Sequence, residues 1–361
     1  MPSEANSLEI AEPLLGCLRQ ALDDPGLDYG IAPHQILGGN ENDIFSFRLK
    51  AAAPFDQPLI LRLFRADATP DRARKEAAVH RAVTTQGLAA PRVLLVGDEY
   101  NCDGRSFLVM EHVAGRSALG LLHPSLFLRL PSLHAKTMIA LHRLDAGVFL
   151  KSAEDAGLDR KSVMLNLDRE TAETKAARDF PSLERLDNWL QQNRPDDGRS
   201  VIAHGDLHPF NLMIDNGEVS AVLDWTGAVV APPEYDIAAN RIIVRYGPVV
   251  GNALQRTLLP LMRRWVLGRF EAIYRAELPI DEPLVRYFEV RQAFDVLTNV
   301  ALLRRAKASD SDALPERDKE SGAFDGPNLR GMLARVEQIS GIRVELPPVA
   351  PTQARRSGAR R

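Results

Sequence analysis

Two short apolar runs flank an Asn-Gly pair in the second half of the chain, and this feature restricts the local fold most strongly. The runs are 212–214 and 219–223, and the turn-forming residues 215–218 lie between them. Asn-Gly in this position is typical of a type I′ turn, because both central residues of that turn need a positive φ. The pattern therefore predicts a β-hairpin centred between Asn216 and Gly217.

The predicted hairpin gathers oxygen-bearing side chains at its open end. Asn211 is expected to face Val222 across the two strands, Asp224 follows two residues later, and Asp206 lies on the loop that enters the first strand. Amide and carboxylate oxygens are ligands that Mg²⁺ prefers, and a carboxylate kept off the metal suits a general base. This spacing indicates a site for phosphoryl transfer, in which metal ions bridge phosphate oxygens and a carboxylate orients the attacking hydroxyl group.

Residues 204–211 read HGDLHPFN, and together with Asp224 they resemble the catalytic segment of the aminoglycoside phosphotransferase and choline kinase-like family. That family shares its fold with the protein kinases, whose catalytic loop reads H-R-D-x-x-x-x-N before a later D-F-G. The resemblance implies that Asp206 is the catalytic base and that Asn211 and Asp224 are Mg²⁺ ligands.

Three more residues have supporting roles in this interpretation. Asp236 lies in a P-x-x-D-I-A segment that resembles the family's, which implies that it steadies the catalytic loop from beneath. His204 suits a structural role more than a catalytic one. His208 suits a contact with the substrate or the metal as well as it suits simple packing.

Two alternative roles for these residues stay open. His204, Asp206 and His208 alternate, so on a strand they would share one face and could bind the metal of a hydrolase, although Asn211 and Asp224 would then have no role. Asp206 and Asn211 could also simply satisfy a turn, as these residue types often do.

The first half of the chain contains the nucleotide-binding residues that the resemblance implies. Gly38, Gly39 and Asn42 precede the apolar run 44–49 in the manner of the family's nucleotide-covering loop. Glycine in such a loop lets the backbone approach phosphate oxygens closely. Taken without the resemblance, the same residues fit an ordinary hairpin turn.

A cation on the next run and a carboxylate on the following helix complete the phosphate side. Arg62 in the run 59–64 corresponds by resemblance to the lysine of the kinase V-A-I-K strand, and its guanidinium can bind phosphate through two nitrogens. Glu76 lies on an otherwise apolar stripe of the predicted helix 70–86, where a carboxylate needs a partner. The resemblance implies that this partner is Arg62. The alternative is a solvent-exposed Arg62, with Arg65 on the opposite strand face.

The segment 107–115 resembles the hinge between the two lobes of a kinase. The resemblance implies that Met110 lies at the back of an adenine pocket and that the backbones of Glu111 and Val113 pair with the adenine edge. An ordinary buried strand that ends at a glycine turn is the alternative.

The wider pattern predicts an α+β fold: a protein-kinase-like two-lobe fold with a small antiparallel β N-lobe that carries one helix, and a mostly helical C-lobe. A leading helix and then short apolar runs broken by turn residues fill the N-lobe, residues 1–113. Residues 114–344 form the C-lobe, which includes the catalytic segment 204–225. Helical spacing marks 133–144, 183–190, 235–246, 254–276 and 284–306. The turn-rich segment 307–327 is expected to be a mobile loop, and 345–361 a disordered basic tail.

Composition excludes several classes of protein. The formal net charge is −3, so no nucleic-acid partner is expected. No run approaches the ~20 apolar residues of a membrane helix, and the acidic start lacks the pattern of a signal peptide. The two cysteines cannot build a disulfide framework. We therefore expect a cytoplasmic monomer or weak homodimer without a membrane partner.

The function expected from this sequence is transfer of the γ-phosphoryl group of ATP, with Mg²⁺ as cofactor, to a hydroxyl group of a small substrate. Aminoglycosides, macrolides, sugars and amino alcohols are all candidate acceptors. Glu289 and Asp295 could bind a cationic aminoglycoside, whereas Tyr287, Phe288 and Trp265 could form an aromatic cage for a choline-like group. A nucleotide-binding pseudokinase or regulatory module without turnover is the alternative.

Overall fold

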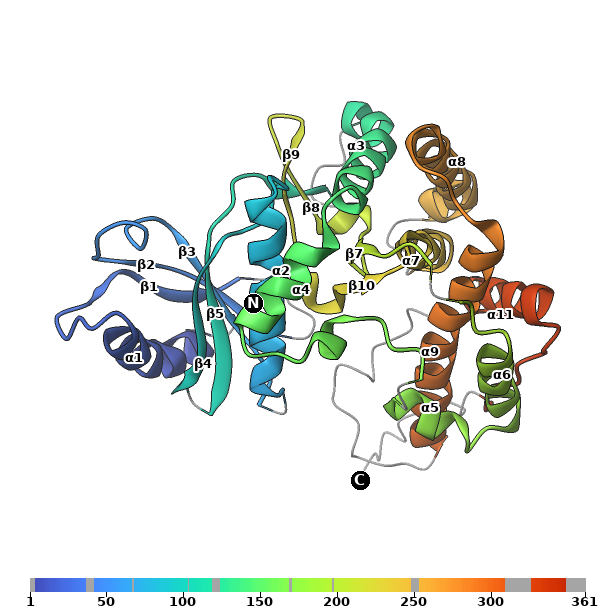
Figure 1. Ribbon diagram of the computed structural model, residues 1–361, viewed down its shortest axis with the longest axis horizontal. Helices are drawn as coiled ribbons and strands as arrows, with labels where there is room; N and C mark the ends of the chain where they lie inside the picture. Colours follow the sequence, from blue (N-terminus) through green and yellow to red (C-terminus); the bar gives the residue numbers. More distant parts are fainter. Residues whose placement is uncertain are drawn as a thin grey trace, which may run out of the picture. The chain divides into compact units, whose positions relative to one another are not determined.

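The computed structural model of the 361-residue chain describes residues 4–36, 42–66, 68–102, 104–118, 124–168, 171–196, 198–247, 253–308 and 326–348 (Figure 1). Two sets of residues form compact units. The first unit comprises Met1–Leu165, Arg199–Asp236 and Gly268–Pro279, and the second comprises Asn166–Gly198, Ile237–Leu267 and Ile280–Arg361. The expected division into lobes 1–113 and 114–344 stays a prediction.

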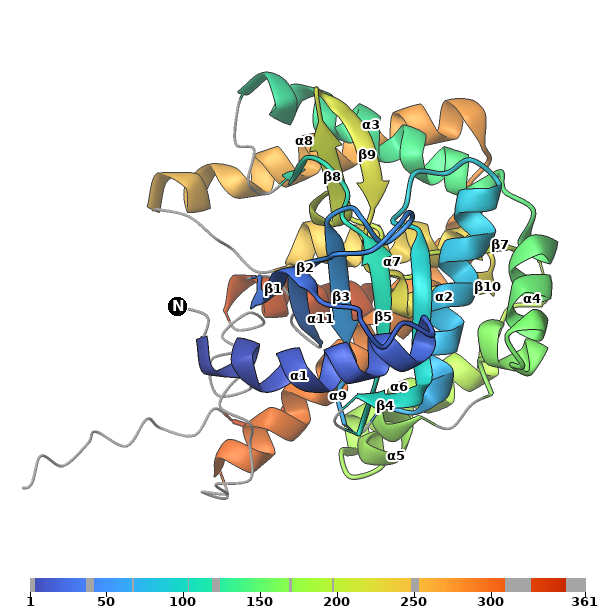
Figure 2. The same ribbon diagram turned by 90° about the vertical axis from the view of Figure 1, so that its left-hand side faces the viewer.

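The first unit contains a five-stranded antiparallel sheet in the order β1-β2-β3-β5-β4. Its strands are β1 (Tyr29–Gln35), β2 (Asp43–Leu49), β3 (Leu59–Leu63), β4 (Val93–Cys102) and β5 (Arg105–Glu111). Helices α1 (Glu4–Ala21) and α2 (Pro70–Thr85) pack on its opposite faces, and α1 crosses in front of the sheet in Figure 2. The predicted small antiparallel sheet, with a leading helix and one further helix, is confirmed.

Strand alternation decides which side chains face which helix. On β5, Phe107 and Val109 lie in an apolar core with α1, whereas Leu108 and Met110 lie in a second core with α2. The odd-numbered leucines of β3 likewise belong to the core with α1. Because successive side chains of a strand point to opposite faces, Arg62 on β3 faces α2.

Two small sheets carry the catalytic segment. β7 (Val201–Ala203) pairs with β10 (Val229–Ala231), and a second sheet has the order β6 (Arg116–Ser117), β8 (Leu212–Asp215) and β9 (Glu218–Val222). Asn216 and Gly217 have φ angles of 49° and 82°, as a type I′ turn requires. The hairpin predicted from the sequence is therefore present.

The register of this hairpin differs from the prediction at its open end. Next to the turn the pairing is as predicted, but further on Val222 faces Leu212 rather than Asn211. The reason is that β9 has five residues and β8 has four, so a bulge takes up the additional residue. Asn211 still lies at the open end, because its carbonyl oxygen accepts a hydrogen bond from Leu223 N–H at 2.8 Å.

The remaining elements are helical. The first unit adds α3 (Pro124–His142) and α4 (Ala146–Asp155), and the second contains α5 (Ala172–Ala177), α6 (Pro181–Gln192), α9 (Glu282–Ala308) and α11 (Pro327–Ser340). Helices α7 (Pro233–Tyr246) and α8 (Ala253–Glu277) have residues in both units. The five predicted helical segments correspond to α3, α6, α7, α8 and α9, and α8 continues through Pro260.

Most of the expected loop 307–327 and of the expected tail 345–361 lies outside the residues that the structure describes. Glu345, at the start of that tail, donates its N–H to Ser182 Oγ at 3.0 Å. Among the described helices, none combines the length and the apolar character that crossing a membrane requires.

Candidate active site

The loop that contains Asp206 is fixed by the buried carboxylate of Asp236. Asp236 accepts hydrogen bonds from the backbone N–H groups of His204 at 2.8 Å and Gly205 at 2.6 Å. Burial alone would raise the pKa of Asp236, but the hydrogen bond from His142 and its neighbours hold the pKa below the ordinary value. Asp236 is therefore ionised at neutral pH, and its contacts are those expected of a residue that steadies the loop.

A glycine is required directly before Asp206. Gly205 has a φ of +81°, a region that residues with a side chain rarely adopt. A Cβ at this position would lie 2.5 Å from the carbonyl oxygen of Gly227, so the two backbones could not approach as they do.

Asp206 itself is held against Asn211. The Asn211 Nδ2 group donates to the Asp206 carbonyl oxygen at 2.9 Å and lies 3.4 Å from the carboxylate Oδ2. His208 Nε2 lies 3.6 Å from Asp206 Oδ1, which is too far for a hydrogen bond. The Asp206 side chain is 46% exposed, so its carboxylate is accessible to a hydroxyl group that arrives from solvent.

Asp224 follows β9 in a left-handed backbone conformation, with φ 61° and ψ 69°. Its Oδ1 accepts hydrogen bonds from Thr226 Oγ1 at 2.8 Å and from Arg62 Nη2 at 2.9 Å. Burial alone would raise the pKa of Asp224, but the Arg62 guanidinium and the Thr226 hydroxyl hold the pKa below its ordinary value. Thr226 was not indicated by any sequence signal beyond its closeness to Asp224.

Arg62 connects the sheet, α2 and the catalytic segment. Its Nε lies 3.1 Å from Glu76 Oε1, and the two side chains are only 10% and 2% exposed. The ion pair predicted between strand and helix is therefore confirmed. The contact from Arg62 to Asp224 joins residues 162 positions apart and was not predicted. Arg65, the alternative cation, is exposed.

Helix α2 also reaches the catalytic segment through aromatic rings. The buried Trp225 ring lies 4.6 Å from the His204 ring and 6.1 Å from the His80 ring, measured between centroids. His80 donates its Nδ1–H to the Pro91 carbonyl oxygen at 2.7 Å, and burial lowers the pKa of His80 to about 4. Burial lowers the pKa of His204 too, so these two rings support the site as neutral groups.

The residues expected to bind the nucleotide base lie at the end of β5. Met110 is buried opposite Ile60 on β3. Glu111 donates its N–H to the Arg92 carbonyl oxygen at 3.0 Å, so on this residue the carbonyl oxygen, not the N–H, is the group that could pair with a base. Val113 is half-buried just beyond the strand.

The glycine loop is only partly described. Gly38 and Gly39 lie outside the described residues, and Asn42, at the start of the next described segment, is buried. The expected roles of all three in nucleotide binding stay predictions.

The oxygen atoms of Asn211 and Asp224 suit Mg²⁺, which prefers hard oxygen ligands and keeps several positions for water and phosphate. Asn211 uses its Nδ2 group on Asp206, which directs its amide oxygen, an acceptor, away from that residue. In the described part of the chain, no three or more His, Cys, Asp and Glu side chains are grouped to hold a metal. Both ring nitrogens of His204 have protein partners: Nε2–H donates to the Leu223 carbonyl oxygen at 3.0 Å, and Nδ1 accepts the Asp206 N–H at 3.3 Å. His204 is therefore not placed as a ligand for the metal of a hydrolase.

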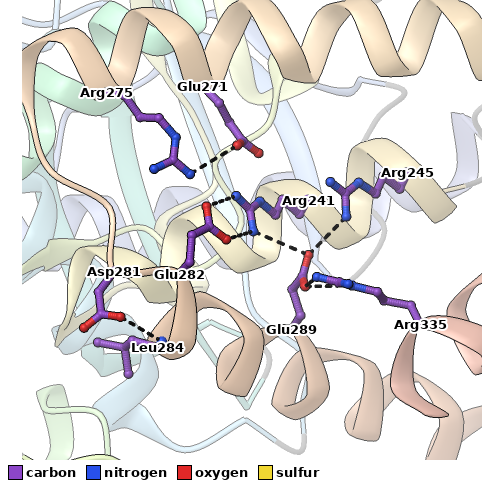
Figure 3. Close-up of polar contacts among 9 residues, drawn as sticks. All are labelled: Arg241, Arg245, Glu271, Arg275, Asp281, Glu282, Leu284, Glu289 and Arg335. Carbon is purple, nitrogen blue, oxygen red and sulfur yellow. Dashed lines mark hydrogen bonds and ion pairs between the residues drawn. The ribbon is translucent and has the colours of Figure 1, made fainter. Parts of the chain in front are cut away.

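The carboxylate suggested for binding a cationic acceptor already has cationic partners. Glu289 on α9 is 1% exposed, and it accepts hydrogen bonds from Arg335 Nε at 3.0 Å and Arg245 Nη1 at 3.3 Å (Figure 3). A carboxylate neutralised in this way has little attraction for another cation, so the suggestion for Glu289 is wrong. Asp295 is likewise paired, with Arg291 Nη1 at 2.5 Å.

The suggested aromatic cage is not present as a group of exposed rings. Tyr287 and Phe288 are buried, and Tyr287 stacks on Trp189 with 6.3 Å between ring centroids. Trp265 keeps 37% exposure. Tyr287 and Phe288 are therefore core residues of the second unit, which their helical spacing allowed equally well.

Comparison of the sequence with known proteins relates most of the chain to one protein family. The sequence profile described as "Phosphotransferase enzyme family" matches residues 34–265. Rat acyl-CoA dehydrogenase family member 11 is 28% identical over 244 residues, which are 63% of this chain and 30% of that protein. The chain thus spans less than a third of the length of that curated relative.

Solved structures with a similar fold include two described as phosphotransferases. One, from Ralstonia eutropha, is provisionally described as an aminoglycoside phosphotransferase; it has a TM-score of 0.59 at 20% identity, over 91% of this chain and 98% of that chain. The other is an aminoglycoside phosphotransferase in a ternary complex with ADP and hygromycin B, with a TM-score of 0.54 at 16% identity, over 91% of this chain and 98% of that chain. At these identities the likeness shows a shared kinase-like fold.

Proposed function

This chain belongs to the phosphotransferase enzyme family, and on that ground we propose that it is an ATP-dependent kinase that transfers the γ-phosphoryl group to a hydroxyl group of a small molecule. The observation that carries the proposal is the convergence of Asp206, Asn211 and Asp224 with the Arg62–Glu76 ion pair in one compact unit. Phosphoryl transfer depends mainly on positioning and charge stabilisation, and these groups are suited to both.

Asp206 is the proposed general base. In the transfer, the acceptor oxygen forms a bond to the γ-phosphorus while the bond from that phosphorus to the bridging oxygen of ADP breaks, and ADP leaves with the electron pair. The proton of the acceptor hydroxyl passes to the Asp206 carboxylate. Because the transition state is loose and needs little early proton removal, we expect Asp206 to act largely by orienting the hydroxyl group.

The phosphate side is assigned to Asn211, Asp224 and Arg62. Asn211 and Asp224 would hold Mg²⁺, which neutralises charge on the β- and γ-phosphates when it is bound. Arg62 would contact a phosphate oxygen, and Glu76 fixes the orientation of its guanidinium. Arginine suits this position because its Nε forms an ion pair with Glu76 while its Nη2 donates a hydrogen bond to Asp224.

The nucleotide base is assigned to the end of β5. Met110 would form the back of the adenine pocket, and the Glu111 carbonyl oxygen and the Val113 N–H would pair with the adenine edge. Gly38, Gly39 and Asn42 would cover the phosphates, as the resemblance to the family's loop implies.

The acceptor is proposed as a small alcohol, and two comparisons suggest where to search. A structural neighbour was determined with hygromycin B, which suggests aminoglycosides. Several curated relatives are named acyl-CoA dehydrogenase family members, which suggests hydroxyl-bearing acyl thioesters. The pairing of Glu289 and Asp295 with arginines removes two carboxylates that a polycationic acceptor would need.

A nucleotide-binding module without turnover is the second candidate, and one observation favours it. Asp224, a proposed metal ligand, is already paired with Arg62 at 2.9 Å, so Mg²⁺ must compete with a buried guanidinium for it. A screen with Mg·ATP, read as ADP release, separates the two candidates across aminoglycosides, macrolides, sugars, amino alcohols and hydroxyacyl thioesters. Acceptor-dependent ADP release supports the kinase, and tight Mg·ATP binding without release above the acceptor-free rate supports the module.

A further inference from the structure

Helix α3 anchors the chain on both sides of Asp206. Before Asp206, the two loop N–H groups bind Asp236, and Asp236 in turn accepts Nε2–H of His142 on α3 at 3.0 Å. After Asp206, the carbonyl oxygen of Leu207 accepts Nε2–H of His134, also on α3, at 3.0 Å. The orientation of the proposed base therefore depends on two histidines of a single helix.

Helix α8 supports both of these histidines from behind. The Tyr274 hydroxyl lies 2.7 Å from His142 Nδ1, and the Phe270 ring lies 4.6 Å from the His134 ring between centroids. Phe270 and Tyr274 are four residues apart, so they lie on one face of α8. All four side chains are buried, with exposures of 1% or less.

The chemistry of the partners fixes where the protons lie. Asp236 is ionised and can only accept, so His142 carries its proton on Nε2. The other ring nitrogen, Nδ1, is left to the Tyr274 hydroxyl, which lies within hydrogen-bond distance of it. Burial raises the pKa of Tyr274, so this hydroxyl keeps its proton at neutral pH. Without the hydroxyl, Nδ1 would be a buried polar atom that has lost its partner, and the His142 ring would be less firmly held in its orientation.

We propose that Tyr274 is a positioning residue of the phosphoryl-transfer site, which acts through His142 and Asp236 on the peptide that precedes Asp206. The inference rests on the proposed kinase function. Its effect falls on the orientation of the base, whereas the nucleotide is assigned to Arg62 and Asp224, which have their own contacts.

Tyr274→Phe removes only the hydroxyl group and tests this role directly. With Mg·ATP and water as the acceptor, kcat for ADP release should fall about tenfold, the effect of losing one buried hydrogen bond, while Kd for Mg·AMP-PNP stays within about twofold. Amide hydrogen exchange at residues 204 and 205 should become about tenfold faster. Tyr287→Phe, a buried tyrosine of the second unit, is the matched control and should change none of these values.

A second pair of variants distinguishes positioning from general loss of packing. His142→Gln keeps an N–H donor for Asp236 and should retain more activity than His142→Ala. It lacks the ring nitrogen that Tyr274 binds, so adding Tyr274→Phe to His142→Gln should lower kcat by less than about twofold.

Unchanged kcat and unchanged amide exchange in Tyr274→Phe would overturn the inference, and so would equal losses of both in the control Tyr287→Phe. It would also be overturned if Tyr274→Phe lowered kcat as much in the His142→Gln background as in the unaltered protein. Failure of the unaltered protein to bind Mg·AMP-PNP would instead contradict the proposed kinase function. In that case the exchange measurement still decides whether Tyr274 holds the loop.

Discussion

Replacing Arg62 with lysine tests whether its guanidinium holds α2 and Asp224 together. Arg62 uses Nε for Glu76 at 3.1 Å and Nη2 for Asp224 at 2.9 Å, and its side chain is 10% exposed. Lysine has a single nitrogen at the end of a flexible stem, so it can keep one of these contacts well but not both. A hydrogen bond to a charged group contributes ~1.5–3 kcal/mol, so the free energy of unfolding should fall by about that amount.

The assay is thermal unfolding followed by calorimetry. At ~2–4 °C per kcal/mol for a unit of this size, Arg62→Lys should lower the melting temperature by about 3–12 °C. Arg65→Lys, an exposed arginine three residues along, is the matched control and should shift it by no more than ~2 °C. Equal melting temperatures for the unaltered protein and Arg62→Lys would refute the reasoning, because they would mean that one cationic nitrogen is sufficient.

Two further predictions concern pH and the catalytic loop. Burial lowers the pKa of His80 to about 4 from 6.5, so the unfolded chain binds a proton that the folded chain does not, and stability should fall as the pH drops from 6.5 to about 4. Urea unfolding at several pH values in this range should show that the free energy of unfolding of His80→Gln depends on pH less steeply than that of the unaltered protein, by ~1.4 kcal/mol per pH unit. Equal slopes for the two proteins would contradict the assignment. Gly205→Ala should abolish turnover and destabilise the loop, because its Cβ would lie 2.5 Å from the Gly227 carbonyl oxygen. Gly157→Ala is the control, because Gly157 has a similar φ of +75° but open space where its Cβ would lie. An equal loss of stability in Gly157→Ala would show that the positive φ alone is responsible.

The local parts of the site could be predicted because their signals lie within a few residues of each other. The Asn216–Gly217 turn determines the hairpin, and the hairpin brings Asn211 next to Leu223. The Arg62–Glu76 pair followed from a carboxylate on an apolar helix stripe, together with the family resemblance. The hairpin follows from the positive φ that its turn requires, and the ion pair follows from the need of a buried carboxylate for a partner.

The parts that could not be predicted depend on tertiary packing. The bulge in β9 moved the partner of Val222 by one residue, and no residue type in that strand signals it. Arg62 reaches Asp224 across 162 positions, and His142 reaches Tyr274 across 132, so neither contact has a local signature. Glu289 is neutralised by arginines of α7 and α11, which the sequence of α9 alone does not show.

The roles of the two aspartates are the centre of the account, and calorimetric titration of Asp206→Ala and Asp224→Ala with Mg·AMP-PNP tests them most directly. Asp224 is assigned to the metal and Asp206 to the acceptor hydroxyl. Asp224→Ala should therefore weaken nucleotide binding at least about tenfold, whereas Asp206→Ala should keep Kd within a few-fold of the unaltered protein, even though its kcat falls by on the order of 10²–10⁴. Loss of nucleotide binding in Asp206→Ala as severe as in Asp224→Ala would contradict the account, because it would make Asp206 a metal ligand.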